Sequence, residues 1–270
     1  GEELTVNYLV EHFKSIGLEP ANGDSYIQNV PLAWVELTND PDLVITNPGG
    51  DDMSLSYRTD QVVWSQQQIP EIEIEQSGLV FVGYGIVAPE YGWNDYADVD
   101  VKGKNVVILV NDPGFATQDP ELFNGNTMTY YGRWDYKFAE AARQGAAGAM
   151  IIHDTKPAAY GWSTVENSWT GRNFNLVFKD KGATLLKMEA WIQREKAAQL
   201  LALAGLDLDE LYESAKQPGF KAIPTDLSLS ATLVNEVETV DSKNVAAILR
   251  GSEAPDEIFI YMAHWDHLGT

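Results

Sequence analysis

The residues best suited to carry chemistry lie at the end of the chain. An apolar run from Ile258 to Ala263 leads into His264, Trp265, Asp266 and His267. The run predicts a strand, and on a strand His264 and Asp266 point to the same face because side chains alternate. Neutral imidazole is the commonest metal ligand, and a ligating histidine often donates its other ring N–H to a carboxylate. Taken without its context, a His-x-Asp pair is more often an ordinary surface or loop pair.

The context of this pair carries a family resemblance. Residues 244–253 predict a strand followed by a turn, and residues 254–257 lead into the apolar run. The segment N-V-A-A-I-L-R-G-S-E, followed after a short interval by A-H-W-D-H-L-G, resembles the first metal-site segment of the di-zinc aminopeptidases of metallopeptidase family 28. The resemblance implies that His264 is a zinc ligand and that Asp266 orients it. His267 matches a family position that is usually not a ligand.

The remaining catalytic groups of that family would lie beyond this chain. In the family a bridging aspartate, a Glu-Glu pair that includes the general base, another carboxylate and a final histidine follow the first motif. Here only Leu268, Gly269 and Thr270 follow His267. We therefore expect this chain to be the N-terminal part of a longer enzyme that holds two zinc ions. Because catalytic zinc takes three protein ligands, the chain alone should bind zinc weakly or not at all and should be inactive.

The composition excludes several other classes of protein. Of the 270 residues, 40 are acidic and 18 are basic, which gives a net charge of −22. Such a surface repels nucleic acid and anionic membranes, both of which need clusters of lysine and arginine. The absence of cysteine excludes disulfides, thiolate metal sites and cysteine nucleophiles. No apolar run is long enough to predict a membrane span.

Two resemblances define the expected domains. Residues 2–16 predict an amphipathic helix ended by Gly17, and this helix with the short strands after it resembles the opening of the peptidase lobe. Between about residues 72 and 240 the order of strands, glycines and a helix at 133–144 resembles the protease-associated domain, a β-rich α/β insert of many exopeptidases. We therefore expect residues 1–71 and 241–270 to belong to an incomplete α/β zinc-exopeptidase lobe, with the insert at 72–240.

Three stretches inside the expected insert have further interpretations. His153 and Asp154 follow a buried strand, and a structural role is favoured there because adjacent strand residues face opposite ways. Residues 160–178 predict a long ordered loop, whose aromatic side chains suit either carbohydrate or peptide contact or simple packing. Residues 185–204 predict a helix, and Asp207 predicts the N-cap of a second one.

The sequence leaves two functions open. In the first, the parent protein is a periplasmic or secreted zinc aminopeptidase that acts on peptides. In the second, the chain is a non-catalytic protease-associated domain that binds a peptide or a protein. In the first case we expect exposed apolar flanks, left uncovered by the rest of the lobe, that favour a homodimer.

Overall fold

The computed structural model describes residues 1–265, and its contacts divide the chain into two compact units. One unit is Ala33–Glu238, and the other combines Gly1–Leu32 with the residues from Thr239 onward. The fold is mixed α/β and rich in strands, which confirms the coarse part of the expected fold class. The division by contacts groups residues 33–71 with the expected insert, whereas the family resemblance groups them with the lobe. The domain boundaries at 71 and 240 remain a prediction.

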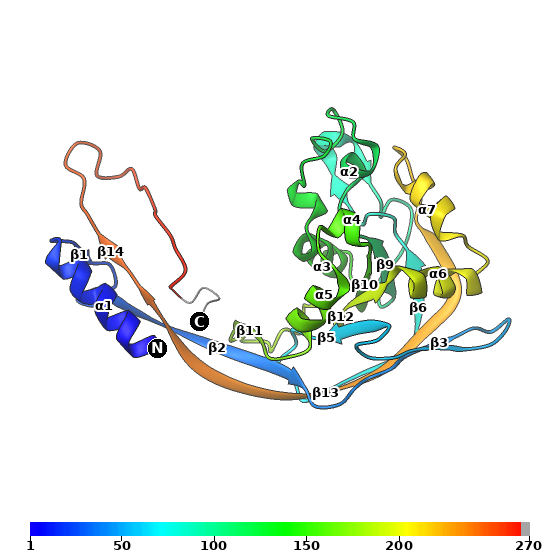
Figure 1. Cartoon of the computed structure of the whole chain (residues 1–270), viewed down its shortest axis with the longest axis horizontal. Helices are drawn as coiled ribbons and strands as arrows, with labels where there is room; N and C mark the ends of the chain where they lie inside the picture. The colour runs from blue at the N-terminus through cyan, green and yellow to red at the C-terminus, as the bar shows by residue number, and fades with distance from the viewer. Residues whose placement is uncertain (266–270) are drawn as a thin grey trace. The chain divides into compact units, whose positions relative to one another are not determined.

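Figure 1 labels most of the helices and strands. The helices are α1 (Glu2–Ser15), α2 (Pro113–Thr117), α3 (Trp134–Arg143), α4 (Thr155–Ala158), α5 (Trp162–Trp169), α6 (Arg194–Leu203) and α7 (Leu208–Ala215), with 3-10 turns η1 (Pro89–Tyr91) and η2 (Tyr130–Gly132). The strands are β1 (Glu19–Pro20), β2 (Ile27–Leu37), β3 (Leu43–Thr46), β4 (Met53–Leu55), β5 (Gln61–Trp64), β6 (Glu71–Phe81), β7 (Val87–Ala88), β8 (Trp93–Asn94), β9 (Asn105–Leu109), β10 (Gly148–His153), β11 (Asn173–Leu176), β12 (Met188–Gln193), β13 (Ile223–Val245) and β14 (Ala247–Ile248). Across residues 1–265 no helix is long and apolar enough to cross a membrane.

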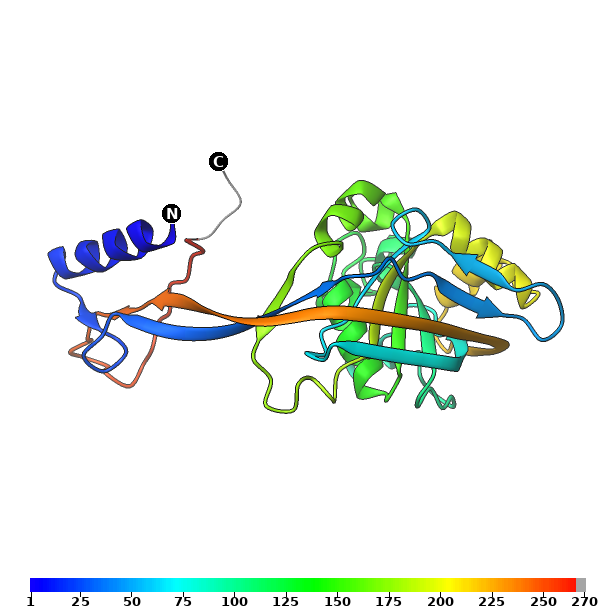
Figure 2. The same ribbon diagram turned by 90° about the horizontal axis from the view of Figure 1, so that it is seen from below.

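One large sheet organises the unit of residues 33–238. Its strand order is β11-β2-β13-β6-β9-β10-β12-β5, and β3 pairs with both β13 and β4. The strands β6, β9, β10 and β12 are parallel to one another, whereas β5 runs antiparallel to β12, and β13 runs antiparallel to β6 and β3. Figure 2 shows β6 lying along β13. The sheet is nearly closed, so its two terminal strands, β5 and β11, come to opposite sides of one seam.

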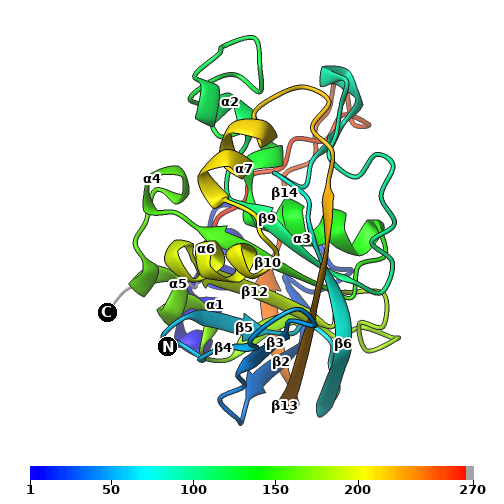
Figure 3. The ribbon, with the colours of Figure 1, turned by 90° about the vertical axis from the view of Figure 1, so that its right-hand side faces the viewer.

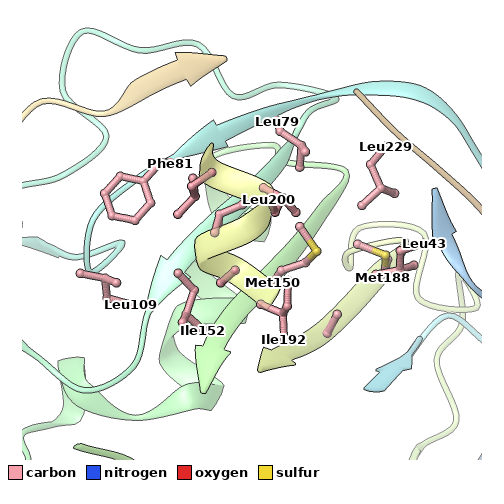
Figure 4. Packing of buried hydrophobic residues seen from close by; sticks show 14 of the residues in the cluster. Leu43, Leu79, Phe81, Leu109, Met150, Ile152, Met188, Ile192, Leu200 and Leu229 are labelled. Atoms are coloured by element: carbon pink, nitrogen blue, oxygen red, sulfur yellow. The ribbon is translucent and has the colours of Figure 1, made fainter. Parts of the chain in front are cut away.

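Side-chain alternation on the central strands builds two cores. On β10, Met150 and Ile152 join one buried cluster, whereas Ala149 and Ile151 join the other. The first cluster packs against Leu200 of α6 (Figure 4), and the second packs against Phe138 of α3. The parallel strands are therefore covered on both faces, as parallel sheets require. Figure 3 shows α6 and α7 together beside β10 and β12.

Local sequence signals explain where several elements begin and end. The Asp207 side chain accepts hydrogen bonds from the main-chain N–H groups of Asp209 and Glu210, which confirms it as the N-cap of α7. Gly83 allows a close approach of the backbone, because its φ is +56° and an added Cβ would lie 2.8 Å from the Phe220 ring. The apolar runs at 105–109 and 148–153 form the buried strands β9 and β10, and the predicted helix at 133–144 is confirmed as α3.

Two predictions inside this unit are wrong. Residues 188–193 form strand β12 between β10 and β5, so the predicted helix at 185–204 is present only as α6. The run is almost fully buried, and a segment that is apolar on every side fits a central strand as well as a helix. The predicted loop at 160–178 contains α5 and β11. There, tertiary packing outweighs the weak helix and strand propensities of Asn, Ser and Trp.

The unit formed by the chain termini contains α1 and a small sheet of β1 with β14. Helix α1 ends as predicted, because Gly17 has φ of +78° and the N–H of Leu18 bonds to the carbonyl of Phe13. The predicted strand at 258–263 is wrong: these residues are irregular, and their trace runs alone in Figure 1. A strand needs a neighbour for its main-chain groups, and the described part of this unit supplies none to this run.

Candidate functional site

The predicted metal ligand lies in the irregular part of the terminal unit. His264 is exposed and belongs to no helix or strand, and Asp266 and His267 lie outside the described residues. The side chains of Ile258 to Met262, directly before His264, are 74–96% exposed. Next to His264, the indole Nε1 of Trp265 donates to the carbonyl of Lys243 at 3.1 Å.

Residues 1–265 contain no group of three His, Asp or Glu side chains arranged to hold a metal ion. His264 and Asp266 together would give one ligand and one orienting carboxylate, which is fewer than the three ligands of a catalytic zinc site. The described residues therefore do not assemble the predicted zinc site by themselves.

A second candidate site lies entirely in the unit of residues 33–238. It is a hollow of about 300 Å³ between the end of β5, helices α3 and α5, and strand β11. Aromatic side chains of Trp64, Trp134, Trp169 and Phe174 line one part of it, and the amides of Gln66, Asn173 and Asn175 line another. None of its lining residues carries a charge. A concave site with apolar walls and a few amides suits an uncharged ligand.

The tryptophans of this hollow pack mainly on one another. The rings of Trp64 and Trp169 stack at 4.1 Å with an interplanar angle of 6°, and Trp134 meets Trp169 edge to face at 4.7 Å. The Phe138 ring also belongs to this group, with its centroid 5.5 Å from that of Trp64. These contacts hold α3 and α5 against β5. Phe174 differs, because its side chain is 56% exposed at the rim.

The sequence Gln66-Gln67-Gln68 joins the two sides of the seam through side chains. Gln66 Oε1 accepts from Asn175 Nδ2 at 2.5 Å, which ties the end of β5 to β11. Gln68 Nε2 donates to the carbonyl of Leu176 at 2.7 Å, and Gln68 Oε1 accepts from the N–H of Phe178 at 3.0 Å. These bonds fix the distance between the edges that form the hollow.

A buried acid lies behind the amides of the hollow. Glu189 on β12 is 2% exposed, and its Oε1 accepts from Gln66 Nε2 at 2.7 Å. Its second oxygen, Oε2, is also buried. Hydrogen bonding by the Gln66 and Trp64 side chains lowers the pKa of the carboxyl, against the larger effect of burial. Burial raises the pKa of Glu189 to about 7. On alternating β12, Glu189 shares a face with Trp191, whose cluster contains Trp64.

A group of buried charges lies elsewhere in the same unit and has a structural role. The Lys137 ammonium donates to the carbonyls of Tyr84 and Tyr131 at 2.7 and 3.3 Å. Asp95 accepts from the N–H of Ile86 at 3.0 Å and from Trp93 Nε1 at 2.7 Å. Burial lowers the pKa of Lys137 to about 7 and raises that of Asp95 to about 7. All but the Trp93 indole bond go to main-chain groups, so these side chains hold the loops around them in place.

The His153–Asp154 pair is structural, as the sequence analysis favoured. His153 is buried and its Nε2 lies 3.0 Å from the carbonyl oxygen of Tyr160. The Asp154 side chain caps α4 by accepting from the N–H of Lys156. Asp154 also lies 3.4 Å from Arg194 on the rim of an open depression of about 800 Å³ beside α7. Most of the charged side chains that line this depression form ion pairs: Arg194 pairs with Asp154 and Asp209, and Lys216 pairs with Glu213.

Most residues of the hollow could not be predicted from the sequence. Glu189 lies in the segment predicted as helix, and Asn173 and Asn175 lie in the predicted loop. One signal was readable: Met188-Glu189-Ala190-Trp191-Ile192 places a lone acid in a short apolar run, as a strand with a polar contact on one face does. Nothing in the sequence placed Gln66 opposite Asn175, since that contact joins residues more than a hundred positions apart.

No protein-family model matches the chain, and no curated protein matches it.

Proposed function

We propose that this chain is the front part of a zinc-dependent aminopeptidase that releases N-terminal residues from peptides. The observation that carries the proposal is the exposed apolar segment from Ile258 to Met262 immediately before His264. Exposed apolar runs of this kind mark surfaces that another protein element covers. The segment has the composition of a central sheet strand, and its resemblance to the first metal-site strand of family 28 supplies the expected neighbours.

In that setting the residues of this chain would have distinct tasks. His264 would hold a metal ion through one ring nitrogen, and Asp266 would accept the N–H of the other nitrogen and fix the ring orientation. Zinc, when bound, activates a water molecule and polarises the scissile carbonyl. The general base and the other ligands would come from residues outside this chain. We therefore retain the expectation that the 270-residue chain alone is inactive.

The first test is the mass of the native polypeptide, detected by immunoblot in cells that make it. The proposal expects a band well above the 29.9 kDa of this chain. A native band at that mass would contradict it and would favour the non-catalytic binding module.

The second test measures turnover of leucyl-4-nitroanilide. We expect the longer native protein to be active, to lose activity with a chelator and to regain it with zinc. His264→Ala should abolish that activity, because it removes a ligand. His12→Ala is the matched control, since His12 is an exposed histidine on α1 and should leave turnover unchanged. Chelator-sensitive turnover by the 270-residue chain alone would refute the expectation that this part is inactive.

A further inference from the structure

We infer that the hollow beside the seam of the sheet binds a small uncharged aromatic amide. The ring of this ligand would lie between Trp134, Trp169 and Phe174, and its amide would bond to Ser65 and Asn173. The inference does not depend on the zinc proposal, because the terminal unit contributes nothing to the lining of the hollow.

The main chain beside the hollow is already hydrogen-bonded, so it leaves no edge for a peptide that would add as a strand. The carbonyl of Leu176 accepts from Gln68 Nε2 at 2.7 Å, and the N–H of Leu176 donates to the Asn175 side chain at 2.8 Å. The N–H of Phe178 donates to Gln68 Oε1 at 3.0 Å. A ligand of the hollow must therefore be recognised by side chains, as a small molecule is.

The dimensions of the hollow suit a small molecule. Its volume is about 300 Å³, at the lower end of the range of ligand pockets. Hydrogen bonds hold its walls in place, because Gln66 bonds to Asn175 on β11 and to Glu189 on β12. Walls that are fixed before binding lower the entropy cost of association, which favours the binding of a small ligand.

The lining of the hollow selects against a charged ligand. Every lining residue is uncharged, although the chain carries a net charge of −22. Arg172, just before the lining residues of β11, is paired with Glu36 at 3.1 Å and stacked over Trp34 at 4.1 Å. The carboxyl of Glu189 bonds to Gln66 and does not line the hollow. A charged ligand would lose its hydration there without gaining a partner of opposite charge.

Two polar side chains of the lining match the two ends of one amide. Asn173 Nδ2 donates to the carbonyl of Gly171 at 3.0 Å, which leaves the Asn173 Oδ1 as an acceptor. The Ser65 hydroxyl oxygen accepts from the N–H of Gln67 at 3.1 Å, which leaves the Ser65 O–H as a donor. An amide supplies an N–H for the first and a C=O for the second. Because Ser65 is 1% exposed, a ligand without an acceptor would leave its hydroxyl unsatisfied.

The aromatic walls favour an aromatic ring over a sugar. A sugar needs an accessible aromatic face, but Trp64 and Trp169 cover each other's faces in their stack at 4.1 Å, and Trp134 meets Trp169 edge to face. Phe174, which is 56% exposed, offers a further ring at the rim. Aromatic rings prefer edge-to-face and offset contacts, so an aromatic ligand can contact the indole edges and the Phe174 ring together.

The test is a titration of the ¹⁵N-labelled 270-residue chain with compounds of nearly the same shape and different charge, namely benzamide, benzoate and benzamidinium. We expect benzamide to shift the indole N–H signals of Trp134 and Trp169 and the side-chain amide signals of Asn173. Benzoate and benzamidinium at the same concentration should leave these signals in place. N-acetylglucosamine is the fourth probe, and it should also leave them in place.

Variants test the two parts of the ligand separately. Asn173→Asp places a carboxylate in the lining with little change of shape, so benzamidinium should then bind about tenfold more tightly than benzamide. Phe174→Ala should weaken benzamide binding about fivefold, because it removes one aromatic contact. Leu176→Ala is the matched control, since Leu176 is 55% exposed on the same strand but does not line the hollow.

Circular dichroism verifies that the variants fold. Benzamide-specific shifts that Asn173→Asp transfers to benzamidinium would support the inference. Equal shifts with the three benzene compounds, binding of the sugar in their place, or no shift with any probe would each overturn it. So would equal effects of Phe174→Ala and Leu176→Ala, or an unchanged preference in Asn173→Asp.

Discussion

Lys137 makes the stability of the unit that contains it depend on pH. Its ammonium is fully buried and bonds to main-chain carbonyls, and burial lowers its pKa to about 7. In the unfolded chain a lysine has a pKa of roughly 10.4. Between these values the unfolded state binds more protons than the folded state, so the free energy of unfolding rises with pH. This contribution is complete above the unfolded pKa and is lost as pH falls to about 7.

We predict that Lys137→Met removes this rise. The difference in free energy of unfolding between the unmodified chain and the variant should grow by on the order of 1–3 kcal/mol from pH 7 to pH 10. Urea denaturation at several pH values measures it. Lys221→Met is the control, because Lys221 is largely exposed and its removal should leave the pH slope unchanged. Parallel curves for the unmodified chain and Lys137→Met would contradict the prediction.

Residues that make long-range contacts were the hardest to predict from the sequence. Asp207 could be identified as a cap because a cap is a local signal with a bond to a residue two or three positions ahead. Lys137, by contrast, is one lysine in an amphipathic helix, and its burial depends on the carbonyl of Tyr84, 53 positions earlier. The contacts of Gln66 with Glu189 and Asn175 could not be predicted for the same reason, because they join residues far apart in the sequence. The predicted roles of His264 and Asp266 remain predictions, since Asp266 lies outside the described residues.

Helices and strands could be predicted where the spacing of the apolar residues and the length of the run indicated the same kind of element. Helix α1 and strands β9 and β10 each have a clear pattern bounded by glycine or by polar residues. Strand β12 has no such boundary, because its apolar run continues directly into α6 without a turn. The run at 258–263 was predicted as a strand but is irregular. Its sequence favours a strand, but a strand forms only beside a neighbour with free main-chain groups.

At the scale of elements, we predict that β10 tolerates no side chain at its first position. A Cβ added at Gly148 would lie 2.2 Å from Asn105 Oδ1 and 3.1 Å from the carbonyl oxygen of Met188, on the two strands that flank β10. Gly148→Ala should therefore lower the free energy of unfolding by about 1–3 kcal/mol, the usual cost of overpacking. Chemical denaturation measures the change.

Gly161→Ala is the matched control for this substitution. Gly161 precedes α5, its φ is −81°, and an added Cβ would meet nothing within 4 Å. It should change the free energy of unfolding by less than roughly 0.5 kcal/mol. If both variants unfolded at the same denaturant concentration, β10 would have more room than the structure gives it.

At the scale of the whole molecule, the net charge disfavours self-association of the chain, whereas the apolar segment favours it. A charge of −22 makes copies of the chain repel, whereas the exposed side chains from Ile258 to Met262 favour contact. We predict that the 270-residue chain forms dimers, more strongly at high salt where repulsion is screened. Replacing both Phe259 and Tyr261 with Asp should give monomers, as measured by sedimentation velocity.

A control pair isolates the segment from apolar exposure in general. Met128 and Tyr130 are 44% and 60% exposed and lie in the other unit, so replacing both with Asp should leave the dimer intact. A monomeric unmodified chain, or dimers that survive the Phe259 and Tyr261 substitutions, would show that this segment does not drive association.

The glutamine series Gln66-Gln67-Gln68 determines where thermal fluctuation can open the sheet. Its side chains make hydrogen bonds across the seam: Gln66 Oε1 accepts from Asn175 Nδ2, and Gln68 bonds to the carbonyl of Leu176 and the N–H of Phe178. Rotation of amide side chains breaks such bonds while the ladder between β10 and its neighbours stays intact. The seam is therefore the line of lowest opening free energy. We expect the main-chain hydrogens of β11 to exchange with deuterium ahead of those in β10, as hydrogen-exchange measurements would show.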